Sequence, residues 1–239
     1  MKKLLMVFLL AQPFFACTTL QQVAGSLPST NGLTETQIIQ GLKEALSIGT
    51  ENSTARLSAA DGFFADAAVK ILMPPEAKDV ENTLRQFGLG SLVDQAILSL
   101  NRAAEDAAKS AAPIFTNAIK QMTINDALGI LEGGDFAATN YFKGKTTSAL
   151  TAAFSPVVAS SLNKVDATKY WSDVFSTYDK FAAKKVPTDL SAYVTQKAID
   201  GIFYEIGLEE QKVRKEPAAR VTDLLKQVFG STQAQQGIK

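Results

Sequence analysis

The chain has 239 residues, 46% of them hydrophobic, and its 24 basic side chains match its 24 acidic ones. It contains no histidine, which excludes Ser–His and Cys–His nucleophiles, imidazole acid–base catalysis and histidine-bound metals, and we predict no metal site and no cofactor. The sequence also lacks the basic stripe that is typical of nucleic-acid-binding proteins, so we expect no nucleic-acid partner.

The N-terminus has the order of an export signal. Two lysines give a positive start, residues 4–10 form an apolar run, and the small residue Ala16 directly precedes Cys17. The run is too short to span a bilayer, which takes about 20 residues. Cys17 is the only cysteine, and a lone cysteine at such a cleavage site is the usual target for lipid attachment in bacteria. We therefore expect residues 1–16 to be a lipoprotein signal peptide and Cys17 to carry the lipid. The alternatives are a plain cleaved signal and a poorly cleaved membrane stub.

Residues 17–33 contain the expected lipidated cysteine and a tether. The tether is uncharged and rich in Thr, Ser, Gln and Gly, so it cannot bury enough apolar surface to order itself. As a flexible coil it would hold the following domain about 20 Å from the membrane. Thr18 follows the cysteine and no acidic cluster comes after it, which resembles the general pattern of envelope proteins sorted to the outer membrane. We expect an outer-membrane lipoprotein that faces the periplasm.

Residues 34–230 are predicted to be a single all-α domain of about nine or ten helices, because apolar residues recur with helical spacing and no alternating strand pattern occurs. A capping box at Thr34 and Gln37 opens the first helix. Gly49 and Gly207 are expected to end helices, and Asp135 to cap one. The helices are predicted over residues 34–48, 75–87, 91–112, 114–122, 124–132, 135–142, 146–162, 166–183, 189–206 and 217–230, with a further stretch over 51–60. Residues 231–239 are predicted to be a flexible tail.

Several short segments occur along this domain in a specific order. They are residues 41–46, 101–105, 122–127, 138–142, 193–201 and 209–230. In this order they resemble the family called domain of unknown function 4197 (DUF4197), which consists of uncharacterised bacterial envelope proteins. The resemblance covers essentially the whole domain from about Gly41. It implies an exported, helical, often lipid-anchored protein, and it brings no activity, ligand or catalytic residue.

Polar residues within these segments form candidate clusters that either bind a ligand or partner or hold helices together. Spacing allows surface pairs between Asn101 and Glu105 and between Arg102 and Asp106. We favour the structural interpretation, and a buried Arg102–Glu105 pair would make Arg102→Ala unfold the domain. The candidates are Asn101, Arg102, Glu105, Asp126, Thr139, Tyr141, Asp200, Glu209, Glu210, Arg214 and Arg220.

No catalytic site identifies itself in the sequence. Ser161 and Lys164 match the Ser-x-x-Lys pattern of serine acyl-enzymes, but the later Lys-Thr-Gly strand of those enzymes is missing. Glu209 and Glu210 are adjacent on a helix and so point about 100° apart, which is not the geometry of two carboxylates facing across a cleft. We therefore lean away from an enzyme and name no catalytic residue.

Three functions remain open from the sequence. The leading hypothesis is a membrane-tethered, non-enzymatic helical module that binds an envelope protein or another envelope component. The second is a carrier or sensor of a small apolar ligand, and the third is a carboxylate-dependent hydrolase. Aromatic residues could line a cavity for an apolar ligand, although such residues more often fill the core. They are Phe63, Phe64, Phe136, Tyr141, Phe142, Phe154, Phe175, Phe181 and Phe203.

Overall fold

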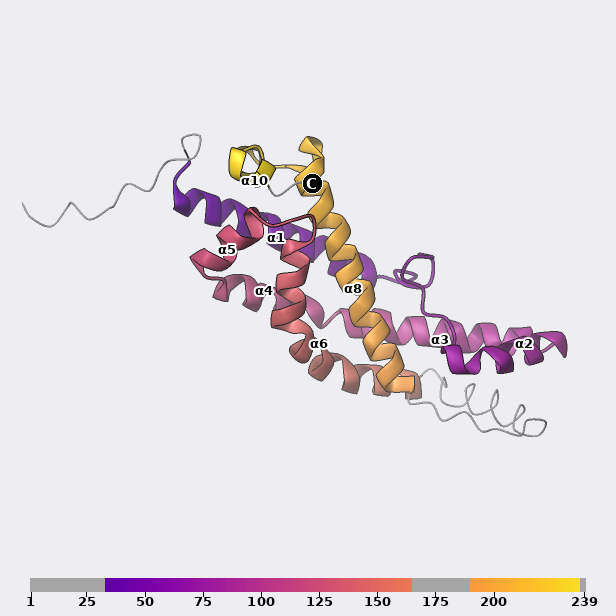
Figure 1. The fold of residues 1–239 in the computed structure, drawn as a ribbon. Coiled ribbons are helices and arrows are strands. Elements are labelled where there is room, and N and C mark those ends of the chain that lie inside the picture. Colours follow the sequence, from indigo (N-terminus) through magenta and orange to yellow (C-terminus); the bar gives the residue numbers. More distant parts are fainter. Residues whose placement is uncertain (1–32, 165–189, 237–239) are drawn as a thin grey trace, which may run out of the picture.

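The computed structural model describes residues 33–164 and 190–236, and the regular structure in these ranges is helical (Figure 1). This confirms the predicted all-α class. The helices are α1 (Glu35–Ser58), α2 (Lys78–Gln86), α3 (Gly90–Ala108), α4 (Ala111–Gln121), α5 (Ile124–Leu131), α6 (Ala137–Lys164), α8 (Leu190–Lys215), α9 (Asp223–Phe229) and α10 (Thr232–Gln236), with the short 3₁₀ helices η1 (Pro75–Ala77) and η2 (Pro217–Ala219). The predicted signal peptide, most of the tether and the predicted helix over 166–183 lie outside the described residues.

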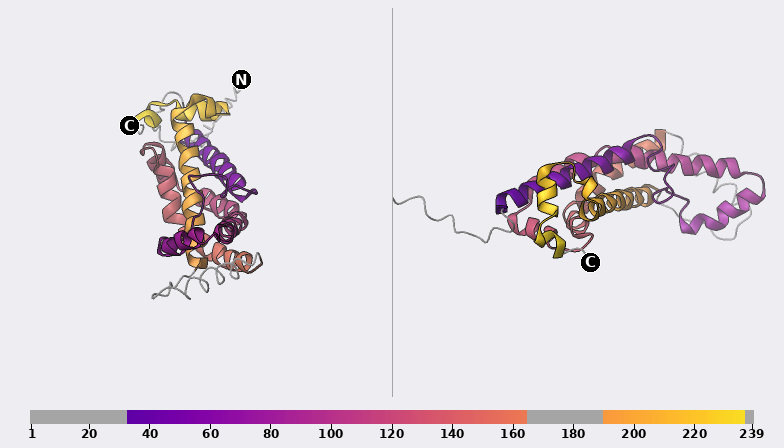
Figure 2. Two further views of the ribbon diagram at one scale, coloured as in Figure 1. Left: turned by 90° about the vertical axis from the view of Figure 1, so that its right-hand side faces the viewer. Right: turned by 90° about the horizontal axis from the view of Figure 1, so that it is seen from above.

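The arrangement is elongated, with α8 crossing the middle of the molecule (Figures 1 and 2). α8 packs against α1, α3 and α6, and α1 also packs against α4 and α9. The α2–α3 pair extends toward one end, while α5 and α10 lie at the other. The helices α6 and α8 therefore lie side by side and provide the longest paired surface of the fold.

Aromatic side chains fill the centre of the core. Phe63, Phe115, Phe142 and Phe154 are fully buried. The Phe115 ring makes edge-to-face contacts with Phe142 and Phe203, with centroid distances of 5.3 and 6.2 Å. Each such pair adds about 0.5–1.5 kcal/mol beyond the area it buries. Most of the described candidate phenylalanines thus pack in the core, while Phe175 and Phe181 lie outside the described residues.

Two predicted helix ends at glycine are wrong. α1 continues through Gly49, and α8 continues through Gly207 for two further turns. At Gly207 another element approaches closely, because an added Cβ would lie 3.3 Å from the Phe136 ring, whereas at Gly49 it would be in ordinary contact, 3.5 Å from the Glu209 Cβ. Packing against these neighbours outweighs the roughly 1 kcal/mol that glycine costs within a helix.

Two further boundaries differ from the prediction. The expected helices over 135–142 and 146–162 are one continuous helix, α6, which contains Pro156. The last predicted helix is divided into η2 and α9, because Thr222 caps the second part by accepting a hydrogen bond from the Leu225 amide at 3.2 Å. The region after it, at the start of the predicted tail, forms α10, beside which Ser231 is buried.

Candidate functional site

One predicted cluster, on α3, holds the loop between α1 and η1. Asn101 is completely buried, and its side-chain oxygen accepts a hydrogen bond from the Ile71 amide at 2.8 Å. Its side-chain nitrogen donates to the Ile71 carbonyl at 2.8 Å and to the Ile97 carbonyl at 2.7 Å. Because both backbone groups of Ile71 are satisfied in this way, one side chain replaces a strand partner and fixes the loop on α3.

Glu105 holds the same loop one turn further along α3. One carboxylate oxygen accepts from the Phe63 and Phe64 amides at 3.2 and 3.3 Å, and the other binds Arg102 at 2.7 Å. Arg102 also binds Asp61 at 2.7 Å, and the hydrogen bonds to Glu105 and then Asp61 raise the pKa of Arg102. The side chain of Arg102 is 35% exposed, so the pair is only half buried.

The predicted pair between Arg102 and Asp106 is wrong, because Asp106 binds Ser161 and Lys109 instead. The hydrogen bond from Ser161, followed by that from Lys109, lowers the pKa of Asp106. A carboxylate with a lowered pKa is a weak proton acceptor, so this geometry does not activate the Ser161 hydroxyl.

A second cluster, on α8, joins three helices. The Glu210 carboxylate accepts hydrogen bonds from the Ala138 and Thr139 amides, both at 2.9 Å, and so caps α6. Asp135, the predicted cap, instead forms an ion pair with Lys215. Glu210 reaches the start of α6 from the neighbouring helix α8, and the order of the chain does not reveal that these helices are neighbours.

Arg214 completes this cluster. It is fully buried, binds Glu210 at 2.9 Å, and donates to the Ile130 and Leu131 carbonyls at the end of α5 at 2.6 and 3.4 Å. Arg220 is also buried and donates to the Val213 and Arg214 carbonyls, and burial lowers the pKa of Arg220. The α6 start, the α5 end and the segment after α8 are thereby held together.

The remaining predicted residues are dispersed. Asp126 forms a capping box with Thr123 at the start of α5, and these hydrogen bonds lower the pKa of Asp126. The Tyr141 hydroxyl donates to the Ala118 carbonyl at 3.5 Å, and burial raises the pKa of Tyr141. Glu209 binds Asn52 at 3.2 Å and Lys212 at 2.5 Å. None of these three carboxyl or hydroxyl groups joins either cluster.

Glu205 is a buried carboxylate that sequence reasoning missed. One oxygen lies 3.1 Å from Arg56, while the other has no hydrogen-bond partner within the described part of the chain. Burial raises the pKa of Glu205, and this effect is larger than the opposing effect of the nearby Arg56 charge. Glu205 lies on the buried side of α8, and this position among apolar residues was the signal in the sequence that could have indicated a buried carboxylate.

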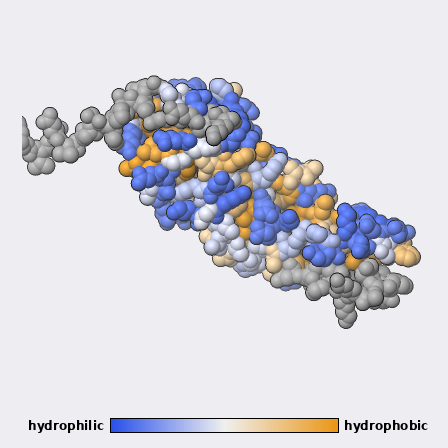
Figure 3. All heavy atoms as spheres, viewed as in Figure 1, coloured by the Kyte–Doolittle hydropathy of each residue, from blue (hydrophilic) through white to orange (hydrophobic). Residues whose placement is uncertain are grey.

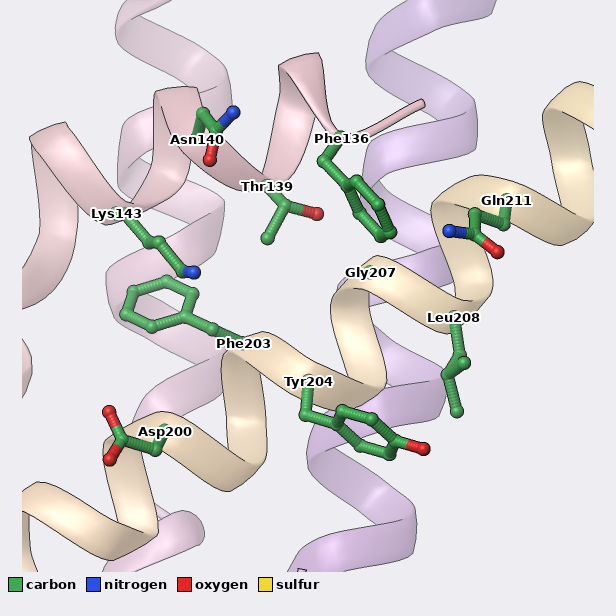
Figure 4. A pocket seen from close by; sticks show the side chains of 10 residues that line it. All are labelled: Phe136, Thr139, Asn140, Lys143, Asp200, Phe203, Tyr204, Gly207, Leu208 and Gln211. Atoms are coloured by element: carbon green, nitrogen blue, oxygen red, sulfur yellow. The ribbon is translucent and has the colours of Figure 1, made fainter. Parts of the chain in front are cut away.

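A groove of about 550 Å³ lies between α6 and α8 (Figure 4). The Phe136 ring lies over Gly207, the Lys143 side chain extends toward the Phe203 ring, and Gln211 stands at one end. Phe136 is 45% exposed and Tyr204 is 46% exposed, so each ring leaves a large part of its surface in water. The lining residues are Phe136, Thr139, Asn140, Lys143, Asp200, Phe203, Tyr204, Gly207, Leu208 and Gln211.

A second hollow of about 480 Å³ continues along α8 beside residues 68–75. It shares Asp200 and Tyr204 with the first, and it adds Tyr193, Lys197 and the exposed Leu72. We call the two hollows together the α8 groove. On the face of the molecule that α8 crosses, apolar patches alternate with hydrophilic ones (Figure 3).

The two polar clusters position the walls of the α8 groove. Asn101 fixes Ile71, which lines the second hollow, and Glu210 fixes Thr139, which lines the first. Asp200 lies where the two hollows meet, and it accepts a hydrogen bond from Gln196 at 2.9 Å. Of the predicted polar candidates, Thr139 and Asp200 line the groove directly, and of the aromatic residues named for a cavity, Phe136 and Phe203 do so.

A sequence signal for the groove existed and was missed. One side of α8 carries residues at successive spacings of four, three, four, four and three, which place them on a single helix face. This face mixes aromatic with polar side chains, unlike the wholly apolar stripe of a core helix. The residues are Tyr193, Lys197, Asp200, Tyr204, Leu208 and Gln211.

Within residues 33–164 and 190–236, no group of three Asp, Glu, Cys or His side chains is arranged to hold a metal ion. None of the helices in these ranges combines the length and apolar character needed to cross a bilayer.

Comparison with known proteins identifies a family for this chain. No curated protein and no solved structure matches this chain. A family model described as "Protein of unknown function (DUF4197)" matches residues 32–230, a range that includes both polar clusters and the whole α8 groove. The chain therefore belongs to the DUF4197 family, as its sequence resemblance predicted.

Proposed function

We propose that this protein is a non-enzymatic binding module of the bacterial envelope, held on a membrane by a lipid on Cys17. In this proposal the α8 groove takes a polypeptide segment of another envelope protein. The observation that carries it is the composition of the groove, in which exposed aromatic rings and polar side chains lie together along two paired helices.

Exposed aromatic side chains favour a protein partner. Phe136 and Tyr204 leave nearly half of their surface in water, and burying such rings at an interface is a common source of binding energy. Phe136 directly precedes α6 and Tyr204 lies on α8, and a buried ion pair and hydrogen bonds position these two helices, so little order has to be created on binding. This arrangement supports binding without chemistry.

The length of the groove favours a chain over a compact ligand. From Tyr193 to Gln211 the α8 face extends for about 27 Å at the rise of an α-helix. An extended polypeptide of about eight residues has this length. The α8 groove therefore suits a segment that lies along α8.

A small-molecule carrier is the second candidate, and one observation favours it. The hollow of about 550 Å³ between α6 and α8 has the size of many small-ligand sites. Native mass spectrometry of the gently purified protein separates the two functions: a small mass that is released on denaturation would favour the carrier.

Photocrosslinking in intact cells tests the proposed function. We would place p-benzoylphenylalanine at Tyr204, in the α8 groove, and as a control at Val221, which is 67% exposed and lines neither hollow. We expect one reproducible protein adduct from position 204 and none from 221. Equal capture at both positions, or no reproducible adduct at 204, would reject the groove as a protein-binding site.

The anchor is tested in the same cells with Cys17→Ser. Without the lipid, the protein is expected to leave the membrane fraction, because each buried methylene of an acyl chain contributes about 0.8 kcal/mol to anchoring. A Cys17→Ser protein that stays with the membrane would reject the lipid anchor and leave the groove result unaffected.

A further inference from the structure

The charges along the α8 groove are predominantly positive. Lys70, Lys143 and Lys197 line it, and Asp200 is its one acidic lining residue. Within the described part of the chain, no carboxylate forms a salt bridge with any of these three ammonium groups. By contrast, Arg102 and Arg214 at the polar clusters have acidic partners. Among residues 33–164 and 190–236, the groove thus retains more positive than negative charge, and none of its three ammonium groups has a salt-bridge partner there.

Each of these ammonium groups lies beside an aromatic ring. Lys143 is 5.9 Å from the centroid of Phe203, and Lys197 is 6.0 Å from that of Tyr193. Lys70 lies 3.8 Å above the Phe64 ring. A carboxylate that binds one of these lysines therefore comes next to an aromatic surface, where an apolar side chain of the same occupant can be buried.

The groove also offers amide groups that a polypeptide backbone can use. Asn140 and Gln211 line it, and each side chain carries both donors and an acceptor. No side-chain hydrogen bond of either residue occurs within residues 33–164 and 190–236. A peptide bond presents the matching N–H and C=O groups, whereas a lipid tail presents neither.

We propose that the occupant of the α8 groove is an acidic polypeptide segment in which carboxylates alternate with apolar side chains. Carboxylates of this segment pair with Lys143 and Lys197, and its apolar side chains pack on Tyr204 and Phe136. This inference rests on the proposed function and adds the chemistry of the partner. Charge complementarity at a partly exposed surface of this kind mainly determines which partner is chosen and how quickly it associates.

Charge reversal in the crosslinking strain tests the inference. With p-benzoylphenylalanine at position 204, we would combine Lys143→Glu with Lys197→Glu. The matched control is Lys78→Glu with Lys120→Glu, which reverses two exposed lysines outside the groove and changes the net charge equally. We expect the adduct to fall about tenfold in the first variant and to stay unchanged in the second. Asp200→Asn should increase the adduct, because it removes the carboxylate that repels an acidic segment.

Sequencing of the crosslinked segment by mass spectrometry gives the second readout. An excess of Asp and Glu over Lys and Arg within about eight residues of the crosslink supports the inference. A captured lipid or glycan rejects the proposed function together with this inference. A neutral or basic segment, or an adduct that persists after charge reversal, overturns this inference alone. In the latter two cases a protein adduct still forms at position 204, so they differ from failure of the proposed function, in which no protein adduct forms. Equal melting temperatures of the variants exclude loss of folding as the cause.

Discussion

At the scale of single residues, Arg214 shows how much burial changes the meaning of a sequence motif. Spacing alone indicates an i,i+4 surface pair with Glu210, worth a few tenths of a kcal/mol. In the structure Arg214 is among the largest fully buried side chains, and its charge is matched by Glu210 and by two α5 carbonyls. Glu210 and Arg214 therefore join neighbouring helices and do not form an exposed surface pair.

This burial predicts different costs for two arginine substitutions. Arg214→Ala should lower the free energy of unfolding by about 3–5 kcal/mol, because it leaves the Glu210 charge buried without its partner. Arg102→Ala should cost only about 1 kcal/mol, since its side chain is 35% exposed and Glu105 keeps two backbone amides. Urea denaturation of both variants measures the difference. Equal losses would contradict the proposed role of burial.

Glu205 gives a prediction about pH. Burial raises its pKa in the folded state above the unfolded value of about 4.3, so the folded state binds the proton more tightly. The resulting stabilisation is complete below the unfolded pKa and is lost as pH rises through the folded pKa. Glu205→Gln, which keeps the shape without the charge, should therefore gain stability relative to the parent between pH 4 and pH 8.

Thermal melts of the parent and of Glu205→Gln across this range measure the effect. Arg56 keeps its ion pair with Asp66 in the variant, so the substitution does not strand that charge. A difference that instead grows toward acid would mean that the pairing with Arg56, and not burial, dominates at Glu205.

At the scale of helices, several glycines lie inside helices, although glycine commonly ends a helix. α1 and α8 run through Gly49 and Gly207, and α8 also contains Gly201. A Cβ at Gly201 would lie 2.6 Å from the ring of Phe63, which is buried and whose backbone amide donates to Glu105. Glycine in these helices allows neighbouring elements to approach closely.

Gly201→Ala should therefore destabilise the protein by about 1–3 kcal/mol through overpacking, even though alanine is the better helix former. The matched control is Gly144→Ala in α6, where a new Cβ has no neighbour within 4 Å and should be neutral or stabilising. Chemical denaturation of both variants measures the effect. A stabilising Gly201→Ala would show that Phe63 moves freely, against its packing in the core.

At the scale of the whole molecule, the polar clusters and the groove form one system. Asn101 and Glu105 fix the loop that forms one wall, and Glu210 with Arg214 fixes the start of α6, which forms another. These polar residues, which lie within the family match, thus position the walls of the α8 groove. The exposed face of α8 between those walls is where we propose that a partner binds.

The all-α class, the capping box at Thr34 and membership of the DUF4197 family were predictable from sequence alone. Each depends on periodicity, on side chains three residues apart, or on the order of segments. All of these can be read along the chain without knowing which segments meet in space. The tertiary structure decided that α1 and α8 continue through glycine, that Glu210 caps α6 across more than seventy residues, and that Asp200 and Tyr204 lie where two hollows meet. These features depend on which helices become neighbours, because burial and hydrogen-bond partners between distant segments exist only once the helices have packed.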